Sequence, residues 1–276
     1  MAASDKIVSL ESHTLNGDWI TVLPQRGRRR MKFSKVATPM EQQHPWVPTD
    51  PTSDTDRQLK IIQKIQTCMK KVESSQFYEN FVEQIQNPDT FNSFCRALGS
   101  ELSFKMVIYG IGSIELYENP RLQLSLAILM RKKFSWIGDI EVFDPVLSVT
   151  EIQVLEALGC SVLSVNEQGR RLAKKPTIFY MPHCEAGLYS NLLQANWKVD
   201  LLKRIVLFGN SFAAYQQYVS GFKNSSIVDS TRYIMAVQKF ADEHAIRTVS
   251  DDYFAAFHDS SWHFFSPAID TELQPV

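Results

Sequence analysis

The chain has 276 residues, of which 44% are hydrophobic, so its length and composition suffice for one large folded domain and a tail. Its 29 Lys and Arg residues balance its 30 Asp and Glu residues, so the overall charge predicts neither a membrane nor a nucleic acid as a direct partner. No apolar run approaches a membrane span of about 18 residues, no secretory signal is recognisable, and the scattered cysteines fit free thiols, which together predict a soluble intracellular protein.

Residues 1–55 are predicted to form a disordered tail, because they are rich in proline and poor in periodic apolar residues. The tail contains a basic run in which five positive charges fall within seven residues: Arg26, Arg28, Arg29, Arg30 and Lys32. Such a run is typical of nuclear localisation signals and of nucleic-acid arms. A solvated basic linker is the alternative interpretation.

Residues 56–99 are predicted to form three helices that pack against the rest of the domain. Apolar residues recur every three to four positions from 56 to 72, which is the pattern of an amphipathic helix. A second helix follows from Gln76. The third begins at Asn87-Pro88, a capping residue followed by a proline suited to the first turn, and ends at Leu98-Gly99.

From residue 105 onward, short apolar runs alternate with helical patterns. This alternation is typical of a parallel sheet covered on both faces. The capping-box sequence Ser148-Val-Thr-Glu151 marks one of the helix starts. We expect strands at 105–109, 140–143, 160–165, 177–181 and 204–208, and helices at 119–133, 148–158, 187–196 and 211–219.

The predicted fold class is therefore α/β, a doubly wound and mainly parallel five-stranded sheet in the order 3-2-1-4-5 with added N-terminal helices. A single domain is expected to span residues 56–266. It comprises the helical preface at 56–99, a core at 105–220 and C-terminal helices at 228–266, and residues 267–276 are expected to be a frayed tail.

The strongest candidate for a site is the point where the loops after strands one and four meet. In the predicted strand order, Gly110-Ile-Gly-Ser113 and Pro182-His-Cys184 lie side by side at the carboxyl edge, where doubly wound sheets bind ligands. Gly110 and Gly112 fit a turn that approaches a nucleotide or S-adenosylmethionine, but the third glycine of a dinucleotide motif is replaced by Glu115. Packing at the end of a buried strand also explains glycines there.

Other polar residues follow the predicted strands and should gather at the same edge. Asp144 suits either a ribose hydroxyl or a turn before Pro145. His183 is a candidate acid or base acting alone, because in an extended segment its side chain and that of Cys184 would diverge. The full set of candidate ligand-binding residues is Gly110, Gly112, Ser113, Asp144, Asn166, Glu167, His183, Asn210 and Ser211. No metal site is expected, and the pattern of these residues assigns neither a cofactor nor a catalytic role.

Several short motifs occur in a fixed order between residues 105 and 220. They are Tyr109-Gly-Ile-Gly112, Phe143-Asp-Pro145, Asn166-Glu-Gln-Gly169, Tyr180-Met-Pro-His-Cys184, Leu188-Tyr-Ser-Asn191 with Asn196-Trp197, and Gly209-Asn-Ser211. In these motifs the chain resembles the SENSITIVITY TO RED LIGHT REDUCED family. The resemblance implies a regulator of the circadian clock, of phytochrome B red-light signalling and of flowering time, located in nucleus and cytoplasm. It implies no catalytic residue, because the family has no established biochemical activity.

Two functional hypotheses follow. The first is a regulatory protein that acts as an interaction scaffold for other signalling or clock proteins, or as a sensor of a small ligand. The second is an enzyme, namely a transferase that uses a nucleotide or S-adenosylmethionine at the switch point after strands one and four. An enzyme needs His183 or Asp144 directed into a pocket, whereas a scaffold is expected to have both side chains hydrogen-bonded within loops.

Overall fold

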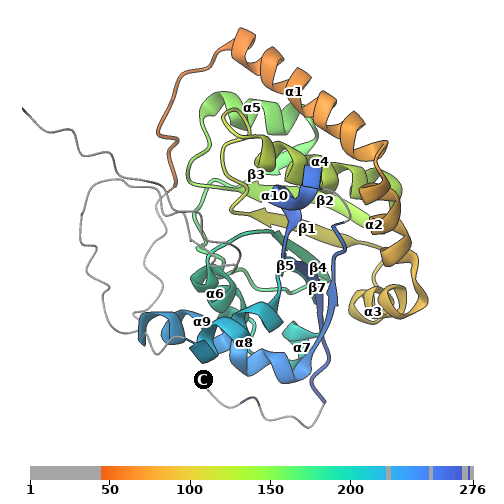
Figure 1. Ribbon diagram of the computed structural model, residues 1–276. Helices are drawn as coiled ribbons and strands as arrows, with labels where there is room; N and C mark the ends of the chain where they lie inside the picture. Colours follow the sequence, from red (N-terminus) through yellow and green to blue (C-terminus); the bar gives the residue numbers. More distant parts are fainter. Residues whose placement is uncertain (1–44, 222–224, 249–250, 269–272, 274–276) are drawn as a thin grey trace, which may run out of the picture. The chain divides into compact units, whose positions relative to one another are not determined.

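The structure is a computed structural model that describes residues 45–221, 225–248, 251–268 and 273 (Figure 1). The basic run at residues 26–32 lies outside these described residues, and so does most of the predicted carboxyl-terminal tail.

The described residues contain a seven-stranded sheet in the order β3-β2-β1-β4-β5-β7-β6. The first five strands of this order pair in parallel, which confirms the predicted doubly wound arrangement 3-2-1-4-5. The strands are β1 (Phe104–Tyr109), β2 (Ile137–Phe143), β3 (Cys160–Val162), β4 (Thr177–Met181), β5 (Ile205–Asn210), β6 (Ala241–Ala245) and β7 (Ser260–Phe265).

The prediction that residues 228–266 form only helices is wrong, because β6 and β7 extend the sheet. β7 pairs antiparallel with β5 and β6 pairs antiparallel with β7. Every residue of β7 is buried, so its apolar run lacks the alternation of a strand with one wet face. β6 has the polar sequence Ala-Asp-Glu-His-Ala, which continues a helical pattern as readily as it starts an edge strand.

Helices cover both faces of the sheet (Figure 1). One face carries α1 to α5 and α10, and the other carries α6 to α9. Their bounds are α1 (Thr55–Glu73), α2 (Gln76–Gln86), α3 (Pro88–Leu98), α4 (Glu118–Lys133), α5 (Val149–Ala157), α6 (Ala186–Ala195), α7 (Val199–Leu202), α8 (Phe212–Gly221), α9 (Ser225–Val237) and α10 (Asp251–Phe257).

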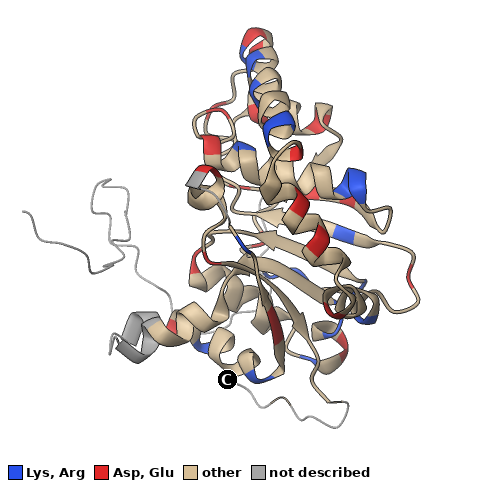
Figure 2. Ribbon diagram, turned by 45° about the vertical axis from the view of Figure 1, so that its right-hand side comes forward, with Lys and Arg blue, Asp and Glu red and all other residues tan. Residues whose placement is uncertain are grey.

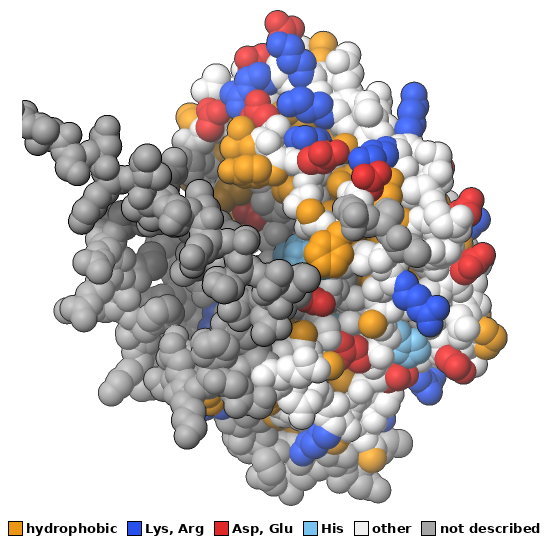
Figure 3. All heavy atoms as spheres, in the orientation of Figure 1, with side chains coloured by type: hydrophobic (Ala, Val, Ile, Leu, Met, Phe, Trp, Pro, Cys, Tyr) orange, Lys and Arg blue, Asp and Glu red, His pale blue; other side chains and the backbone are white. Residues whose placement is uncertain are grey.

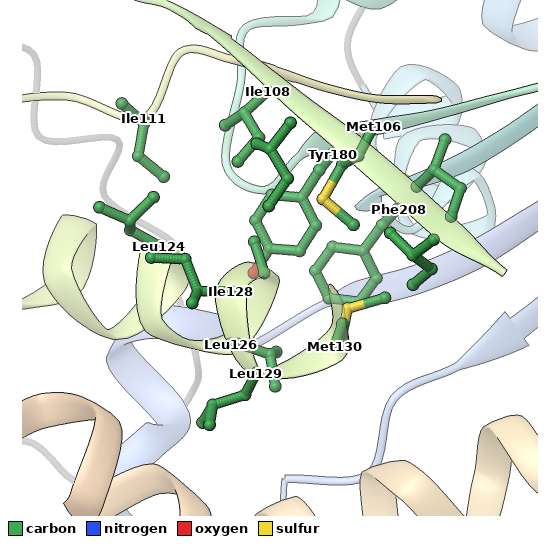
Figure 4. Close-up of a cluster of buried hydrophobic side chains, with 14 of the residues drawn as sticks. Met106, Ile108, Ile111, Leu124, Leu126, Ile128, Leu129, Met130, Tyr180 and Phe208 are labelled. Atoms are coloured by element: carbon green, nitrogen blue, oxygen red, sulfur yellow. The ribbon is translucent and has the colours of Figure 1, made fainter. Parts of the chain in front are cut away.

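Side chains of each central strand alternate between these two layers. In β1, Met106 and Ile108 join the cluster under α4, whereas Val107 and Tyr109 join the cluster under α6. Figure 4 shows Met106 and Ile108 on the side of α4 where Leu124 and Ile128 lie. The hydroxyl of Tyr180, also in this layer, donates to the carbonyl oxygen of Gln123 at 2.9 Å. Helix α4 is deeply buried, with ten buried residues from Pro120 to Met130.

Two of the predicted capping signals mark helix starts, and one does not. Asn87 caps α3, and Ser148 and Glu151 form the predicted capping box at the start of α5. Asn119, by contrast, does not cap α4, which begins at Glu118 without a side-chain cap. The Asn119 side chain instead donates to the carbonyl oxygen of Ala255, and this bond ties α4 to α10.

The tail predicted for residues 1–55 is too long at its carboxyl end, because residues 45–54 pack against the domain. The Trp46 ring lies 5.4 Å from that of Phe143, and its backbone N–H donates to the carbonyl oxygen of Ser164 at 2.7 Å. Farther along, the carbonyl oxygen of Asp50 accepts from the Val149 N–H at 3.1 Å. Residues 45–54 therefore contact β2, the loop after β3 and the start of α5.

Basic side chains predominate along α1, whose two acidic residues, Asp56 and Glu73, stand near its ends (Figure 2). Lysines occupy its exposed face, where their side chains are visible in the space-filling view (Figure 3). Among the described residues, no helix combines the length and apolarity needed to cross a membrane.

His263 on β7 makes the stability of the fold depend on pH. Its side chain is fully buried, with its ring 4.0 Å from that of Phe212 and its Nε2 3.7 Å from Glu243 Oε1. Burial lowers the pKa of His263 below its ordinary value, although Glu243 opposes this effect and His244 adds to it. The imidazole is therefore neutral in the folded protein near neutral pH.

We predict that the free energy of unfolding falls by roughly 1–2 kcal/mol between pH 7 and pH 5 because of this histidine. A group whose pKa is lowered by folding stabilises the protein above its unfolded pKa, and that contribution is lost as the pH falls below it. Urea unfolding at pH 7 and at pH 5 measures this change in the free energy of unfolding. The change should be smaller in the His263→Gln variant. An equal pH dependence in the two proteins would contradict the prediction.

Candidate functional site

A hollow of about 530 Å³ lies at the carboxyl ends of β1, β2 and β4. The predicted neighbours Gly110 and His183-Cys184 both line it, and the Cys184 thiol donates to the carbonyl oxygen of Tyr109 at 3.2 Å. The meeting of the loops after strands one and four is thereby confirmed. Of the candidate residues, Gly110, Asp144, Asn166 and His183 line the hollow, whereas Gly112, Ser113, Glu167, Asn210 and Ser211 lie outside its lining.

The backbone amides of the glycine turn are already hydrogen-bonded to the protein. The N–H of Gly110 donates to the carbonyl oxygen of Phe143 at 3.2 Å, and the N–H of Gly112 donates to Asp144 Oδ2 at 2.8 Å. Both glycines have positive φ, 68° and 77°, a conformation that other residues adopt at a cost. The turn therefore has the backbone shape expected of a phosphate-binding loop, but a protein carboxylate occupies one of its donors.

Glu151 holds the second half of the same loop, which is a role that the sequence analysis missed. Its Oε1 accepts from the Ser113 hydroxyl at 2.6 Å and from the Glu115 N–H at 3.0 Å. Its Oε2 accepts from the N–H and the hydroxyl of Ser148, each at 2.9 Å, which completes the capping box of α5. The capping box was visible in the sequence, but nothing there indicated that the free oxygen reaches across to the β1 loop.

Asp144 has the role of a turn residue. Besides Gly112, its carboxylate accepts from the Val146 N–H at 2.9 Å, which closes the turn after β2. Its side chain is buried, and burial raises the pKa of this carboxyl even though the two N–H donors oppose the effect. Asp144 still lines the hollow, and each of its carboxylate oxygens accepts one hydrogen bond and can accept another.

Glu115, which replaces the third glycine of a dinucleotide motif, is directed away from the turn towards α1. It forms a two-pronged ion pair with Arg57, in which Nε donates at 2.9 Å and Nη2 at 2.6 Å. Arg57 also pairs with Asp50 at 3.1 Å, so this contact joins the N-terminal segment, α1 and the β1 loop.

His183 is held in a strained loop conformation rather than in the extended one that we predicted. Its φ is 57°, and its N–H donates to Asn210 Oδ1 at 2.7 Å. The Nε2 of its ring lies 3.0 Å from the carbonyl oxygen of His258, so this nitrogen carries the proton. The side chains of His183 and Cys184 do diverge, and a paired nucleophile is not formed.

Asn210 and Ser211 serve the loops around the hollow. The Asn210 amide nitrogen donates to the Cys184 carbonyl oxygen at 3.1 Å and to the Tyr215 hydroxyl at 3.0 Å, so one side chain joins β5, α8 and the β4 loop. The Ser211 hydroxyl accepts from the Ala214 N–H at 3.2 Å in the first turn of α8. Both residues therefore position the rim without lining the hollow.

Asn166 and Glu167 lie in the connection between β3 and β4, residues 163–176, which contains neither helix nor strand. The Asn166 Oδ1 accepts from the Gln168 N–H at 2.9 Å. Glu167 accepts a hydrogen bond from the Tyr109 hydroxyl and lies 3.6 Å from Arg171, which pairs in turn with Glu141 at 2.5 Å. Burial and this carboxylate raise the pKa of Tyr109, so its hydroxyl keeps its proton.

The arrangement suits binding better than catalysis. Burial also raises the pKa of the Cys184 thiol, and an uncharged buried thiol is a poor nucleophile. Asp144 and His183 both have structural partners within the loops. Within the described part of the chain, no three His, Cys, Asp or Glu residues are grouped so as to hold a metal ion.

We predict that Gly110→Ala lowers the free energy of unfolding by about 2 kcal/mol, since the left-handed φ is strained for alanine. The new methyl group would also lie 2.6 Å from Cys184 Sγ. Gly187→Ala is the matched control, because a methyl group there meets nothing within 4 Å. Equal urea midpoints for the two variants would contradict this account of the turn.

Solved structures with similar folds are methyltransferases of low similarity. A putative O-methyltransferase from Klebsiella pneumoniae is 10% identical and has a TM-score of 0.39, covering 78% of this chain and 92% of its own. The 23S rRNA methyltransferase ErmE is 11% identical with a TM-score of 0.35, covering 69% of this chain and 71% of its own. Neither likeness bears on function.

Sequence relatives are much closer. Protein SENSITIVITY TO RED LIGHT REDUCED 1 of Arabidopsis thaliana is 55% identical over 96% of this chain and 97% of its own length. An SRR1-like protein of Mus musculus is 42% identical over 41% of this chain and 46% of its own length. The model of the SRR1 domain matches residues 82–264, from α2 to β7. On these grounds, the chain belongs to the SRR1 domain family.

Proposed function

We propose that this protein regulates red-light signalling, and that it does so as an interaction scaffold or as a sensor of a small ligand. The observation that carries the proposal is its 55% identity with SENSITIVITY TO RED LIGHT REDUCED 1, which extends over 96% of the chain. The proposal includes the circadian clock, phytochrome B signalling and flowering time as the processes affected. Its partners are then other signalling or clock proteins, and it acts in the nucleus and the cytoplasm.

The contacts of the two candidate catalytic side chains support a scaffold or sensor over an enzyme. Asp144 accepts from the N–H groups of Gly112 and Val146, and His183 is bonded through both its backbone and its ring. A general acid or base needs a free position towards its substrate. Side chains that hold loops together are expected of a protein that presents a fixed surface.

A transferase is the second candidate, and the hollow at the switch point is the observation that favours it. Its volume of about 530 Å³ falls in the range of small-molecule sites. A nucleotide cofactor is less well supported, because the glycine turn has its Gly110 and Gly112 N–H groups engaged by Phe143 and Asp144.

We predict that this chain restores the red-light response of Arabidopsis seedlings that lack SENSITIVITY TO RED LIGHT REDUCED 1. The His183→Ala variant should restore it equally, because the proposed role does not use the imidazole as an acid or base. Seedling growth under red light is the measurement, with protein levels compared by immunoblot. A chain that is expressed at the normal level but has no effect would contradict the proposed role.

The basic run yields a separate prediction about location. Replacing Arg28, Arg29 and Arg30 with alanine should modestly lower the nuclear share of a tagged chain, if the run is an import signal. Only a modest change is expected, since a chain of 31.6 kDa also enters the nucleus by diffusion. The matched control replaces Lys60, Lys64 and Lys70, three exposed lysines of α1. An equal nuclear share for both variants would identify the run as a solvated linker.

A further inference from the structure

We propose that the hollow binds an uncharged or cationic nucleoside-type molecule, with a flat base and a hydroxylated sugar but no phosphate. This inference rests on the sensor role proposed above and names the ligand that such a sensor takes. Four features of the described residues lead to it: the state of the turn amides, the charge of the lining, the polar atoms without partners, and the apolar walls.

The bonded amides of the glycine loop disfavour a phosphate. In a phosphate-binding turn the backbone N–H groups after the first strand are free to contact the anion. Here the N–H of Gly112 is bonded to Asp144 at 2.8 Å, and that of Glu115 is bonded to Glu151 at 3.0 Å. Two carboxylates of the protein thus occupy two of the backbone donors of this loop, and their negative charge disfavours an anionic ligand there.

The charge of the residues that line the hollow also disfavours a phosphate. Asp144 and Glu185 line the hollow, and no Lys or Arg is among the described residues that line it. The amino end of α6 is a potential anion site, but Glu185 stands at its N-cap and makes no side-chain capping bond there. The carboxylate therefore offsets the positive end of the helix at the place where a phosphate would bind.

Amide side chains supply donors and acceptors for a neutral ligand. The exposed Asn166 accepts from the Gln168 N–H through Oδ1, and its Nδ2 donates no hydrogen bond to a described residue. Asn191 donates through Nδ2 to the Gln168 carbonyl oxygen at 2.9 Å, and its Oδ1 has no hydrogen-bond partner among the described residues. One donor from the 163–176 loop and one acceptor from α6, both among the lining residues, match the polar edge of a base or of an amide.

Apolar groups and a carboxylate complete the match to a nucleoside. Tyr109, Phe143 and Leu188 form apolar walls, and Gly187 leaves open space between them. A flat base fits such walls, and sugar hydroxyls can donate to the free lone pairs of Asp144, as ribose does to acidic residues after a strand. Carboxylates in the lining also attract a cationic ligand, whereas the positive charge of a phosphate-binding site would repel it.

The test is isothermal titration of the full chain with four nucleosides, their 5′-monophosphates and S-adenosylmethionine. At least one nucleoside or S-adenosylmethionine should bind, and the monophosphate of the same base should bind at least tenfold more weakly. No binding of any nucleoside or of S-adenosylmethionine at millimolar concentration would overturn the proposal. A monophosphate that binds as tightly as its nucleoside would overturn it too.

Two variants locate the site. Gly187→Leu should fill the hollow and abolish binding with an unchanged melting temperature, because nothing lies within 4 Å of its first added atom. Asp144→Asn should reduce the ratio of the affinity for the nucleoside to the affinity for its monophosphate. Asp139→Asn, at an exposed position of β2, should leave this affinity ratio unchanged. If the Gly187→Leu variant still binds the nucleoside, or if Asp144→Asn does not alter the affinity ratio, the hollow is not the binding site.

This outcome is independent of the signalling role. If the wild-type chain restores the red-light response but binds no nucleoside, the ligand proposal fails and the scaffold remains. If the chain binds a nucleoside but does not restore the response, the signalling role fails instead. A Gly187→Leu chain that loses both binding and the response would support the two together.

Discussion

Two buried carboxylates, Asp144 and Glu151, fix the loop after the first strand, and the architecture of the carboxyl edge depends on them. Each accepts from the backbone of the glycine loop and from the start of its own turn or helix. The loops after β1 and β2 are thereby locked to each other by charge-assisted hydrogen bonds, which are about twice as strong as neutral ones. The same bonds engage the N–H groups of Gly112 and Glu115, which lie in the loop where a nucleotide-binding sheet has free backbone donors.

The hollow also depends on the absence of a helix from the described connection between β3 and β4. A doubly wound sheet would place a helix between β3 and β4, but residues 163–176 form a loop instead. The fully buried Asn196 supports this loop, accepting from the Ala173 N–H at 2.8 Å and donating to the Arg171 carbonyl oxygen at 2.7 Å. A loop covers less of the sheet than a helix does, and Asn166, Gln168 and Gly169 of this loop form one wall of the hollow.

The first five strands and their order were predictable because they rest on local signals: apolar runs, capping residues and the alternation of strand with helix. The pairing of β7 with β5 was not predictable, since Ser260–Phe265 is buried on both faces and has no periodicity. Several residues of the hollow were predictable as strand ends. The reach of Glu151 to Ser113 was not, because it depends on how α5 packs against the β1 loop, which no spacing in the sequence encodes.

The most direct test of the central claim is a proton NMR titration of the Gly112 amide. If that N–H donates to the Asp144 carboxylate, its resonance should move downfield as the carboxyl ionises. The midpoint should lie above 3.8, because burial raises the pKa of Asp144. The amide should also exchange slowly with solvent. A resonance that does not respond to pH and an amide that exchanges as fast as an exposed loop would contradict the account, because the donor would then be free for a phosphate.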